Sequence, residues 1–227
     1  MLQVKFANDF NIPFLTYNGH HGTLTTLGKM DYGIEIYLPQ LDSFSIAKDG
    51  KSVTVGGGIN VKNMTDALLA AGKQTGKLGL RTHGPLVMIS QCLVTGCCEC
   101  VSYLGPALGG GHGWFQGRYG LIADQFLSMN VVLANGDLKT IDSKSDLWWG
   151  MQGAGHNFGV VTSVTSKVYD VTNYDWAIET IVFSGDKVEE VYDAVNKYIV
   201  QDGKQADDIH DWTYWQNDAR YSTEGVR

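Results

Sequence analysis

The sequence predicts an α+β fold, and three observations lead to this prediction. Alternating apolar residues flank the turn dipeptides Asp49-Gly50 and Asn135-Gly136, a pattern typical of β-hairpins. Apolar residues recur at helical spacing within residues 61–69 and again within 188–199, which predicts two helices with one apolar face each. Glycine accounts for 28 of the 227 residues, and its clusters predict loops between these elements.

Composition places the chain among folded proteins. Hydrophobic residues make up 44% and charged residues 18%, which excludes disorder as the main state. The formal charge is −7 and the chain lacks a block of Lys or Arg, so we expect no nucleic-acid partner. No apolar run approaches the roughly 18 residues of a membrane span, so we expect no membrane partner. No signal-type apolar stretch follows Met1, and the localisation stays open.

The N-terminal half predicts the end of a helix, two strands, a hairpin and a complete helix. In order, these elements cover residues 2–7, 12–17, 34–38, 44–55 and 61–69. In the hairpin, Phe44 and Ile46 are expected to face Val53 and Val55 across the turn. Asn60 precedes the helix and is the residue type that caps helix N-termini.

The C-terminal half predicts a second hairpin, a short helix, two strands and a helix. In order, these cover residues 131–141, 146–151, 160–168, 176–183 and 188–199. The tail from Asp202 to Arg227 is polar and aromatic, and no closing element is predicted there. Trp148, Trp149 and Phe158 are expected in the core rather than stacked on a cofactor.

Three loops share one design and suggest a common ligand. They span residues 18–22, 109–113 and 153–159, and each combines glycines with a histidine. Successive backbone N–H groups in such a loop form a nest that binds an anion, for example a diphosphate. None of these loops contains Lys or Arg, so backbone amides would have to do most of the binding.

Two common phosphate-binding motifs are excluded by context. A Rossmann fingerprint follows a strand and opens a helix, whereas the loop at 153–159 follows a helix and leads into a strand. A Walker loop at Gly72-Lys73-Gln74 would need Ser or Thr in place of Gln74 and a glycine in place of Ala67.

The chain resembles the flavin-linked oxidases of the vanillyl-alcohol oxidase class, most of all the fungal berberine-bridge-enzyme-like branch. The matching pieces come in the family's order and are residues 4–22, 95–113, 119–124, 135–136 and 146–162. The intervening segment 76–94 has no clear period and interrupts the match. We interpret this segment as an insertion, such as a translated intron or an error of gene prediction.

The resemblance implies a PCMH-type FAD-binding domain of two α+β subdomains with the cofactor between them. Residues 1–170 are expected to form this domain, without its N-terminal part. Residues 171–227 are expected to be the truncated start of an antiparallel-sheet substrate domain. The family's catalytic base comes from that second domain or from its return to the flavin, so no residue is assigned a catalytic role.

The resemblance also implies which residues hold FAD. The family pattern Gly-Gly-His-Gly aligns with residues 19–22, so it implies a covalent bond from His21 to the flavin 8α-methyl group, with His20 in place of a glycine. In bicovalent members a cysteine also bonds flavin C6, and this role maps to Cys98, with Cys100 as the alternative. The residues carried over as cofactor-binding are Asn18, Gly19, His20, His21, Gly22, Cys98, Gly105, Gly109, Gly110, Gly111, His112, Asp124, Gly155, Phe158, Gly159 and Val160.

The cysteine cluster allows functions other than a bond to flavin, and one polar residue differs from the family. Cys97 and Cys100 have C-x-x-C spacing with His112 nearby, which alone does not establish zinc, so no metal site is predicted. A thiol-redox role and inert packing also remain open for this cluster. Gln125 departs from the family, which usually has Asn after the aspartate at 124.

The function implied is that of an FAD-dependent oxidase. It would remove a hydride from an alcohol, sugar or secondary-metabolite substrate and be reoxidised by O2, so its partners would be a small-molecule substrate and O2. The alternatives are a catalytically silent flavin-binding or interaction module that lacks the substrate domain, and an unfolded product of gene prediction.

Overall fold

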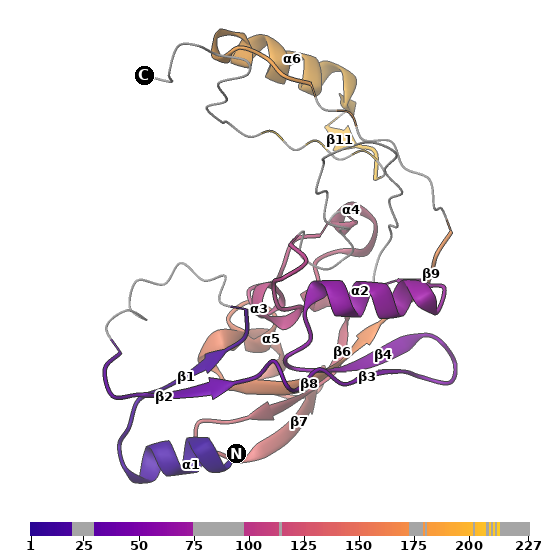
Figure 1. Ribbon diagram of the computed structural model, residues 1–227. Helices are drawn as coiled ribbons and strands as arrows, with labels where there is room; N and C mark the ends of the chain where they lie inside the picture. The colour runs from indigo at the N-terminus through magenta and orange to yellow at the C-terminus, as the bar shows by residue number, and fades with distance from the viewer. Residues whose placement is uncertain are drawn as a thin grey trace. The chain divides into compact units, whose positions relative to one another are not determined.

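A computed structural model describes residues 1–19, 30–74, 98–113, 115–172, 179, 181–201, 203–207, 209, 211 and 213 (Figure 1). These residues form two units, Met1–Ile181 and Val182–Arg227, and each is described by itself. Segment 76–94 lies outside the described residues, so its interpretation as an insertion stays a prediction. The domain boundary expected at residue 170 also stays a prediction.

A five-stranded antiparallel sheet forms the centre of the first unit. Across the sheet its strands are β3 (Phe44–Ile46), β4 (Ser52–Gly56), β8 (Val160–Lys167), β6 (Phe126–Val132) and β7 (Leu138–Asp142). Every neighbouring pair is antiparallel. Strand β8 therefore lies in the middle, hydrogen-bonded to β4 on one side and to β6 on the other.

Short helices cover one face of this sheet and close the core. They are α2 (Val61–Ala70), α3 (Leu104–Ala107) and α5 (Trp148–Met151), and Figure 1 shows α2 lying over β3 and β4. Each helix contributes buried side chains to one continuous cluster. The sheet residues in that cluster include Val53, Val55, Met129, Val131, Ile141 and Val164.

The other face of the sheet carries polar side chains bonded to one another across the strands. Thr54 and Thr165 share a hydrogen bond between their hydroxyls, with 2.9 Å between the oxygens. Thr140 donates to Asn130 Oδ1 at 2.6 Å, and Asn130 Nδ2 donates to Ser163 Oγ at 2.8 Å. This alternation of apolar and polar faces fixes the register, because a shift by one residue would expose the core.

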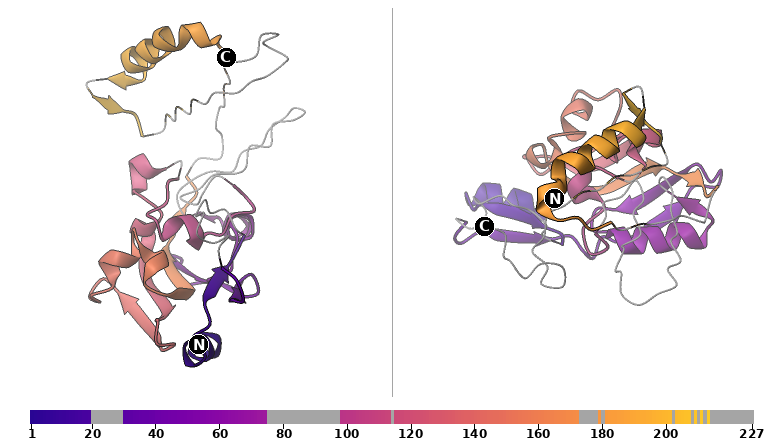
Figure 2. Two further views of the ribbon diagram at one scale, coloured as in Figure 1. Left: turned by 90° about the vertical axis from the view of Figure 1, so that its left-hand side faces the viewer. Right: turned by 90° about the horizontal axis from the view of Figure 1, so that it is seen from above.

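The N-terminal segment forms a small helix and a parallel strand pair. Helix α1 (Leu2–Asp9) precedes β1 (Phe14–Tyr17), which pairs in parallel with β2 (Ile34–Tyr37). Val4 and Ala7 on α1 are buried. Both views in Figure 2 show α1 at the edge of the unit, outside the five-stranded sheet.

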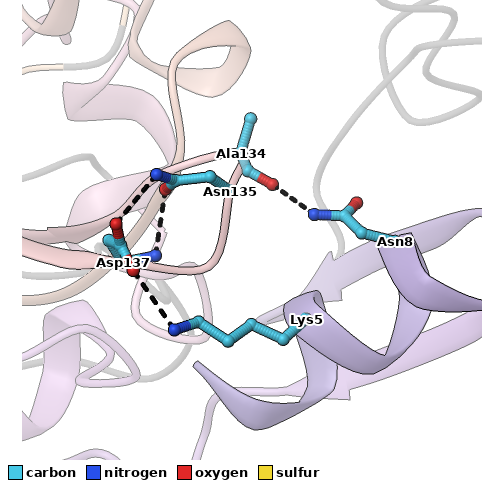
Figure 3. A network of polar contacts seen from close by, with 5 residues as sticks. All are labelled: Lys5, Asn8, Ala134, Asn135 and Asp137. Carbon is cyan, nitrogen blue, oxygen red and sulfur yellow. Dashed lines mark hydrogen bonds and ion pairs between the residues drawn. The ribbon is translucent and has the colours of Figure 1, made fainter.

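Polar contacts fasten α1 to the β6–β7 turn (Figure 3). Asn8 Nδ2 donates to the carbonyl oxygen of Ala134 at 2.6 Å, and Lys5 Nζ lies 3.2 Å from Asp137 Oδ1. The turn is itself braced, since Asn135 and Asp137 exchange two hydrogen bonds. Because an exposed ion pair contributes only about 0–1 kcal/mol, the burial of Val4 and Ala7 is the larger contribution to this docking.

Two short strands extend the first unit beyond the C-terminal end of β8. Strand β9 (Tyr169–Asp170) pairs antiparallel with β5 (Lys73–Gln74), which follows α2. Gln74 Nε2 donates to the carbonyl oxygen of Asp170 at 2.8 Å, and Lys73 forms an ion pair with the Asp170 carboxylate. The chain leaving the sheet is thereby tied to the end of α2.

The second unit contains one helix and one small hairpin. Helix α6 (Val188–Tyr198) follows a 3-10 turn, η4 (Gly185–Lys187), and precedes the pair β10 (Val200–Gln201) and β11 (Lys204–Gln205). None of the α6 side chains is buried. Across the described ranges, helices fall short of the length and apolar content that a bilayer crossing requires.

Most of the predicted elements are confirmed. The first hairpin has the predicted register, with Phe44 opposite Val55 and Ile46 opposite Val53. Asn60 caps α2, because its Oδ1 accepts a hydrogen bond from the Asn63 amide at 2.7 Å.

Four expectations are wrong. Residues 181–183 carry no strand, although one was expected over 176–183, whose other described residue, 179, is also not in a strand. The tail contains β11, which pairs with β10 just before it, although no closing element was expected there. Trp149 is 86% exposed rather than in the core, because it lies on the outer side of the four-residue helix α5, whereas Trp148 packs against the core. Phe158, also expected in the core, is exposed as well, because it lies in the loop that follows the 3-10 turn Gly155–Asn157.

Replacing the cap of α2 should weaken the first unit measurably. We expect Asn60→Ala to lower the free energy of unfolding by about 1 kcal/mol, because the Asn63 amide loses its acceptor. Asn63→Ala is the matched control, since it keeps that amide and should change stability by less than about 0.5 kcal/mol. Urea unfolding of both variants checks this, and equal midpoints would contradict it.

Candidate cofactor site

The first glycine loop begins against two other segments of the first unit. Asn18 Nδ2 donates to the carbonyl oxygen of Gly57 at 3.2 Å. Gly19 has a φ of +67°, and a Cβ there would lie 3.0 Å from the Cys100 carbonyl oxygen and 3.5 Å from the Ser102 amide nitrogen. The start of this loop therefore lies next to residues 100–102. The remaining predicted residues of the loop, His20, His21 and Gly22, lie outside the described residues.

Both described cysteines lie on a turn beside this loop. The Val101 amide donates to the Cys98 carbonyl oxygen at 3.2 Å, which closes a turn over residues 98–101. Cys98 and Cys100 are free thiols and both are exposed, whereas Val101 is buried. Either sulfur is therefore accessible to a ligand, and exposure alone does not choose between them.

Ser102 is a structural residue of this site that the sequence reasoning missed. Its Oγ accepts hydrogen bonds from the amides of Leu104 and Gly105, each at 3.2 Å, at the start of α3. Gly105 thus has its amide satisfied within the protein. A serine two residues before a helix is a known capping signal and would have identified it.

The second glycine loop is held by two hydrogen bonds from residues 122 and 123. The Ala123 amide donates to the Gly110 carbonyl oxygen at 2.9 Å, and the Ile122 amide donates to the Gly111 carbonyl oxygen at 3.0 Å. A trans peptide plane directs its carbonyl and the following N–H in opposite directions. The N–H groups of Gly111 and His112 therefore point away from residues 122–123.

These amides fit a ligand that brings acceptor oxygens. Gly111 and Gly113 are buried, yet within the described ranges the amides of Gly111, His112 and Gly113 donate no hydrogen bond. A buried N–H without a partner costs free energy, and nearly all such groups in native proteins are paired. Three successive unpaired donors suit the diphosphate of a dinucleotide, so the residues present fit FAD.

Polar side chains near this loop bond to the protein itself. His112 Nδ1 lies 2.7 Å from Gln116 Oε1 on α4 (Gln116–Tyr119), and the histidine is exposed. Asp124 Oδ2 accepts a hydrogen bond from the Leu121 amide at 2.8 Å. Both predicted site residues thus shape the loop and its support. Among the described residues, no group of three or more His, Cys, Asp or Glu is placed to hold a metal ion.

The third glycine loop contacts Leu108, the residue that directly precedes the second one. The Gly155 amide donates to the Leu108 carbonyl oxygen at 2.9 Å, and a Cβ at Gly155 would lie 2.7 Å from Leu108 Cδ2. Phe158 lies against Gly150 and remains 38% exposed. The predicted residues Gly159 and Val160 lead into β8. Loops 109–113 and 153–159 are therefore neighbours.

Gln125 supports the second loop from behind, although the sequence marked it only as a departure from the family. It is 1% exposed. Its Nε2 donates to the carbonyl oxygens of Tyr119 and Leu121 at 2.6 and 3.0 Å, and its Oε1 accepts from the Tyr169 hydroxyl at 2.9 Å. Together with Asp124 and with Gln152, whose Nε2 donates to the Ala123 carbonyl oxygen at 3.1 Å, Gln125 thus holds the segment that bonds to Gly110 and Gly111.

Burial raises the pKa of two tyrosines near Gln125. Burial raises the pKa of the Tyr103 hydroxyl, which shares a hydrogen bond with Ser166 Oγ, 3.0 Å away. Burial also raises the pKa of Tyr169, with a smaller contribution from Tyr119, whose ring stacks on it with centroids 4.2 Å apart. A neutral phenol is a hydrogen-bond donor, as the contact with Gln125 requires.

Comparison with known proteins identifies the cofactor. The family described as FAD binding domain (FAD_binding_4) matches residues 89–142. FAD-linked oxidoreductase chry5 from Gibberella zeae is 58% identical over 215 residues, which are 95% of this chain and 39% of that protein. The chain therefore spans about two fifths of the length of this relative. These matches confirm the predicted resemblance to FAD-linked oxidoreductases, and the family match supports FAD as the cofactor.

Solved structures confirm the fold class. BBE-like 1 from Physcomitrella patens superposes with a TM-score of 0.61 at 27% identity, over 75% of this chain and 34% of that one. The 6-hydroxy-D-nicotine oxidase from Arthrobacter nicotinovorans superposes with a TM-score of 0.60 at 27% identity, over 74% of this chain and 33% of that one.

A side chain at Gly111 should disturb the second loop. Gly111 has a φ of +74°, and a Cβ there would lie 2.7 Å from Ile122 Cδ1. We expect Gly111→Ala to lower the free energy of unfolding by about 1–3 kcal/mol, because both the backbone conformation and the contact are strained. Gly109→Ala is the control, since its Cβ would meet only Pro106 O at 3.4 Å. Thermal unfolding compares the two, and an equal loss in both would contradict this account.

Proposed function

From its homology with the FAD-linked oxidoreductases, we propose that this chain forms the FAD-binding part of a flavin oxidase. The enzyme would remove a hydride from an alcohol, sugar or secondary-metabolite substrate, with O2 as the final acceptor. The observation that carries this proposal is that the amides of residues 111–113, within the matched FAD binding domain, donate no hydrogen bond to any of the described residues. The names of its relatives, an FAD-linked oxidoreductase and an oxidase, support the reaction class.

The chain's own residues would bind and orient the cofactor. The amides of Gly111 and His112 would donate to diphosphate oxygens, together with the glycine loop that begins at Asn18 and Gly19. Gly105, Gly109, Gly110, Gly155, Phe158, Gly159 and Val160 would line the site, and Asp124 would brace it. When bound, FAD would accept the hydride and pass two electrons to O2, which yields hydrogen peroxide. No residue of this chain is assigned as the catalytic base.

Binding of FAD by the purified chain tests this proposal directly. Titration with FAD, followed by quenching of flavin fluorescence, should saturate with one FAD per chain. Gly111→Ala should bind FAD more weakly, whereas Asn63→Ala, a change on the exposed side of α2 outside the glycine loops, serves as the folded control with unchanged binding. A parent chain that is folded and fails to bind FAD would overturn the proposal.

A catalytically silent flavin-binding module is the second candidate. It is the alternative because the amides described above fit FAD, whereas none of the described residues is assigned as a catalytic base. A peroxide assay with a panel of alcohols and sugars separates the two. Peroxide production by the FAD-loaded chain would support the oxidase, and FAD binding without peroxide would support the silent module.

The proposed covalent link through His21 gives a sharp test. We expect the parent chain to keep its flavin absorbance after acid precipitation, because a bond from the imidazole to the 8α-methyl group survives unfolding. In chains that also carry Cys98→Ser, His21→Ala should give a colourless pellet, whereas His20→Ala, a matched change one residue away, should give a coloured one. A colourless pellet from the parent chain, loaded with FAD before precipitation, would contradict the link.

The proposed second link through Cys98 is tested in the background without His21. Chains with His21→Ala should keep flavin through a thioether, so that precipitated protein stays coloured. Adding Cys98→Ser should release the flavin, and adding Cys100→Ser should not. Because both thiols are exposed, accessibility does not bias the comparison. The opposite result would assign the link to Cys100, and loss of colour in His21→Ala alone would remove the second link altogether.

A further inference from the structure

We propose that Gln125 and Tyr169 are positioning residues that aim the amides of Gly111 and His112 and so set the affinity for FAD. The proposal rests on the FAD-binding function above and adds two residues from outside the glycine loops. Neither residue is placed against the cofactor. They act through the segment 119–125, whose backbone holds the second glycine loop.

Both the NH2 group and the carbonyl oxygen of the Gln125 carboxamide form hydrogen bonds within the protein. Its NH2 group donates both hydrogens, to the carbonyl oxygens of Tyr119 and Leu121, and its carbonyl accepts from the Tyr169 hydroxyl. These contacts close the chain from residue 119 to 125 into a compact loop. Since Gln125 is 1% exposed, water cannot replace a lost partner without opening the core.

No similar side chain can make the same set of contacts. Glutamate has the same length, but its ionised form has no hydrogen to donate to Tyr119 and Leu121. Asparagine has the same group on a stem that is shorter by one carbon, so it cannot span the same three partners. Leucine fills a similar volume and would leave the Tyr119 carbonyl and the Tyr169 hydroxyl without partners.

A change at Gln125 would reach the amides that face the ligand through two peptide planes of the second glycine loop. Residues 122 and 123 lie inside the loop that Gln125 closes, and their amides hold the carbonyls of Gly111 and Gly110. Turning either carbonyl turns the N–H in the same plane by the same angle. A change at Gln125 that loosens residues 122–123 therefore reorients the donors of Gly111 and His112 without touching them.

Tyr169 anchors this arrangement to the sheet. It lies on β9, directly after β8, and its hydroxyl fixes the Gln125 carbonyl from a position 44 residues away in the sequence. Its ring stacks on Tyr119, whose own hydroxyl makes no hydrogen bond with the described residues. The two stacked tyrosines thus offer a matched pair, one with the hydrogen bond and one without.

Removal of each hydroxyl in turn tests the proposal on the full chain. Hydrogen exchange measured without FAD should speed up about tenfold at the Ile122 and Ala123 amides in Tyr169→Phe and stay unchanged in Tyr119→Phe. The dissociation constant for FAD should rise about tenfold in Tyr169→Phe only. Unchanged exchange at these two amides in Tyr169→Phe, or equally faster exchange throughout β6 and β8, would overturn the positioning role.

Gln125→Glu adds a pH readout that a merely structural role would not show. Burial raises the pKa of a carboxyl group, and its protonated form regains one hydrogen to donate. As the pH falls, the affinity of this variant for FAD should approach that of the parent chain. A constant ratio of the two affinities across pH would contradict the proposal. If the parent chain binds no FAD, the FAD-binding function fails, while the exchange data still decide the positioning role.

Discussion

The central strand β8 is the constraint on which the three glycine loops depend. The first loop reaches it through Asn18, which bonds to the Gly57 carbonyl while the Gly57 amide donates to the Thr162 carbonyl at 2.8 Å. The third loop leads into it at Val160. The second loop reaches its far end through Gln125, whose backbone carbonyl accepts from Ser166 Oγ. A strand paired on both sides cannot shift alone, so it gives the loops a common frame.

This frame explains why glycine recurs where loops and strands meet. A Cβ at Gly57 would lie 2.2 Å from the carbonyl oxygen of Val161, a neighbour of the bonded Thr162. The backbone there packs directly against backbone, with no side chain between that could adjust. The contact between the first loop and β8 is therefore short and rigid, and it fixes the position of the loop relative to the strand.

Local chemistry made much of the fold predictable. The Asn60 cap, the first hairpin register and the strand at residues 160–168 follow from residue types within one element, and each is confirmed. The strand expected near residue 181 and the core position of Trp149 are wrong for the same reason. Periodicity shows that a segment has an apolar face, but it does not show whether a partner covers that face.

The candidate site was predictable only in part, because glycine permits a conformation without selecting it. The clusters at 109–113 and 153–159 identified the loops, and contact of Gly155 with Leu108 places them together. The direction of the amides is selected instead by residues with no motif of their own, Gln125 and Tyr169. Their contact joins positions 44 residues apart, and the sequence marked Gln125 only as a departure from the family and Tyr169 not at all. A motif search therefore finds the donors, whereas only the folded chain reveals what aims them.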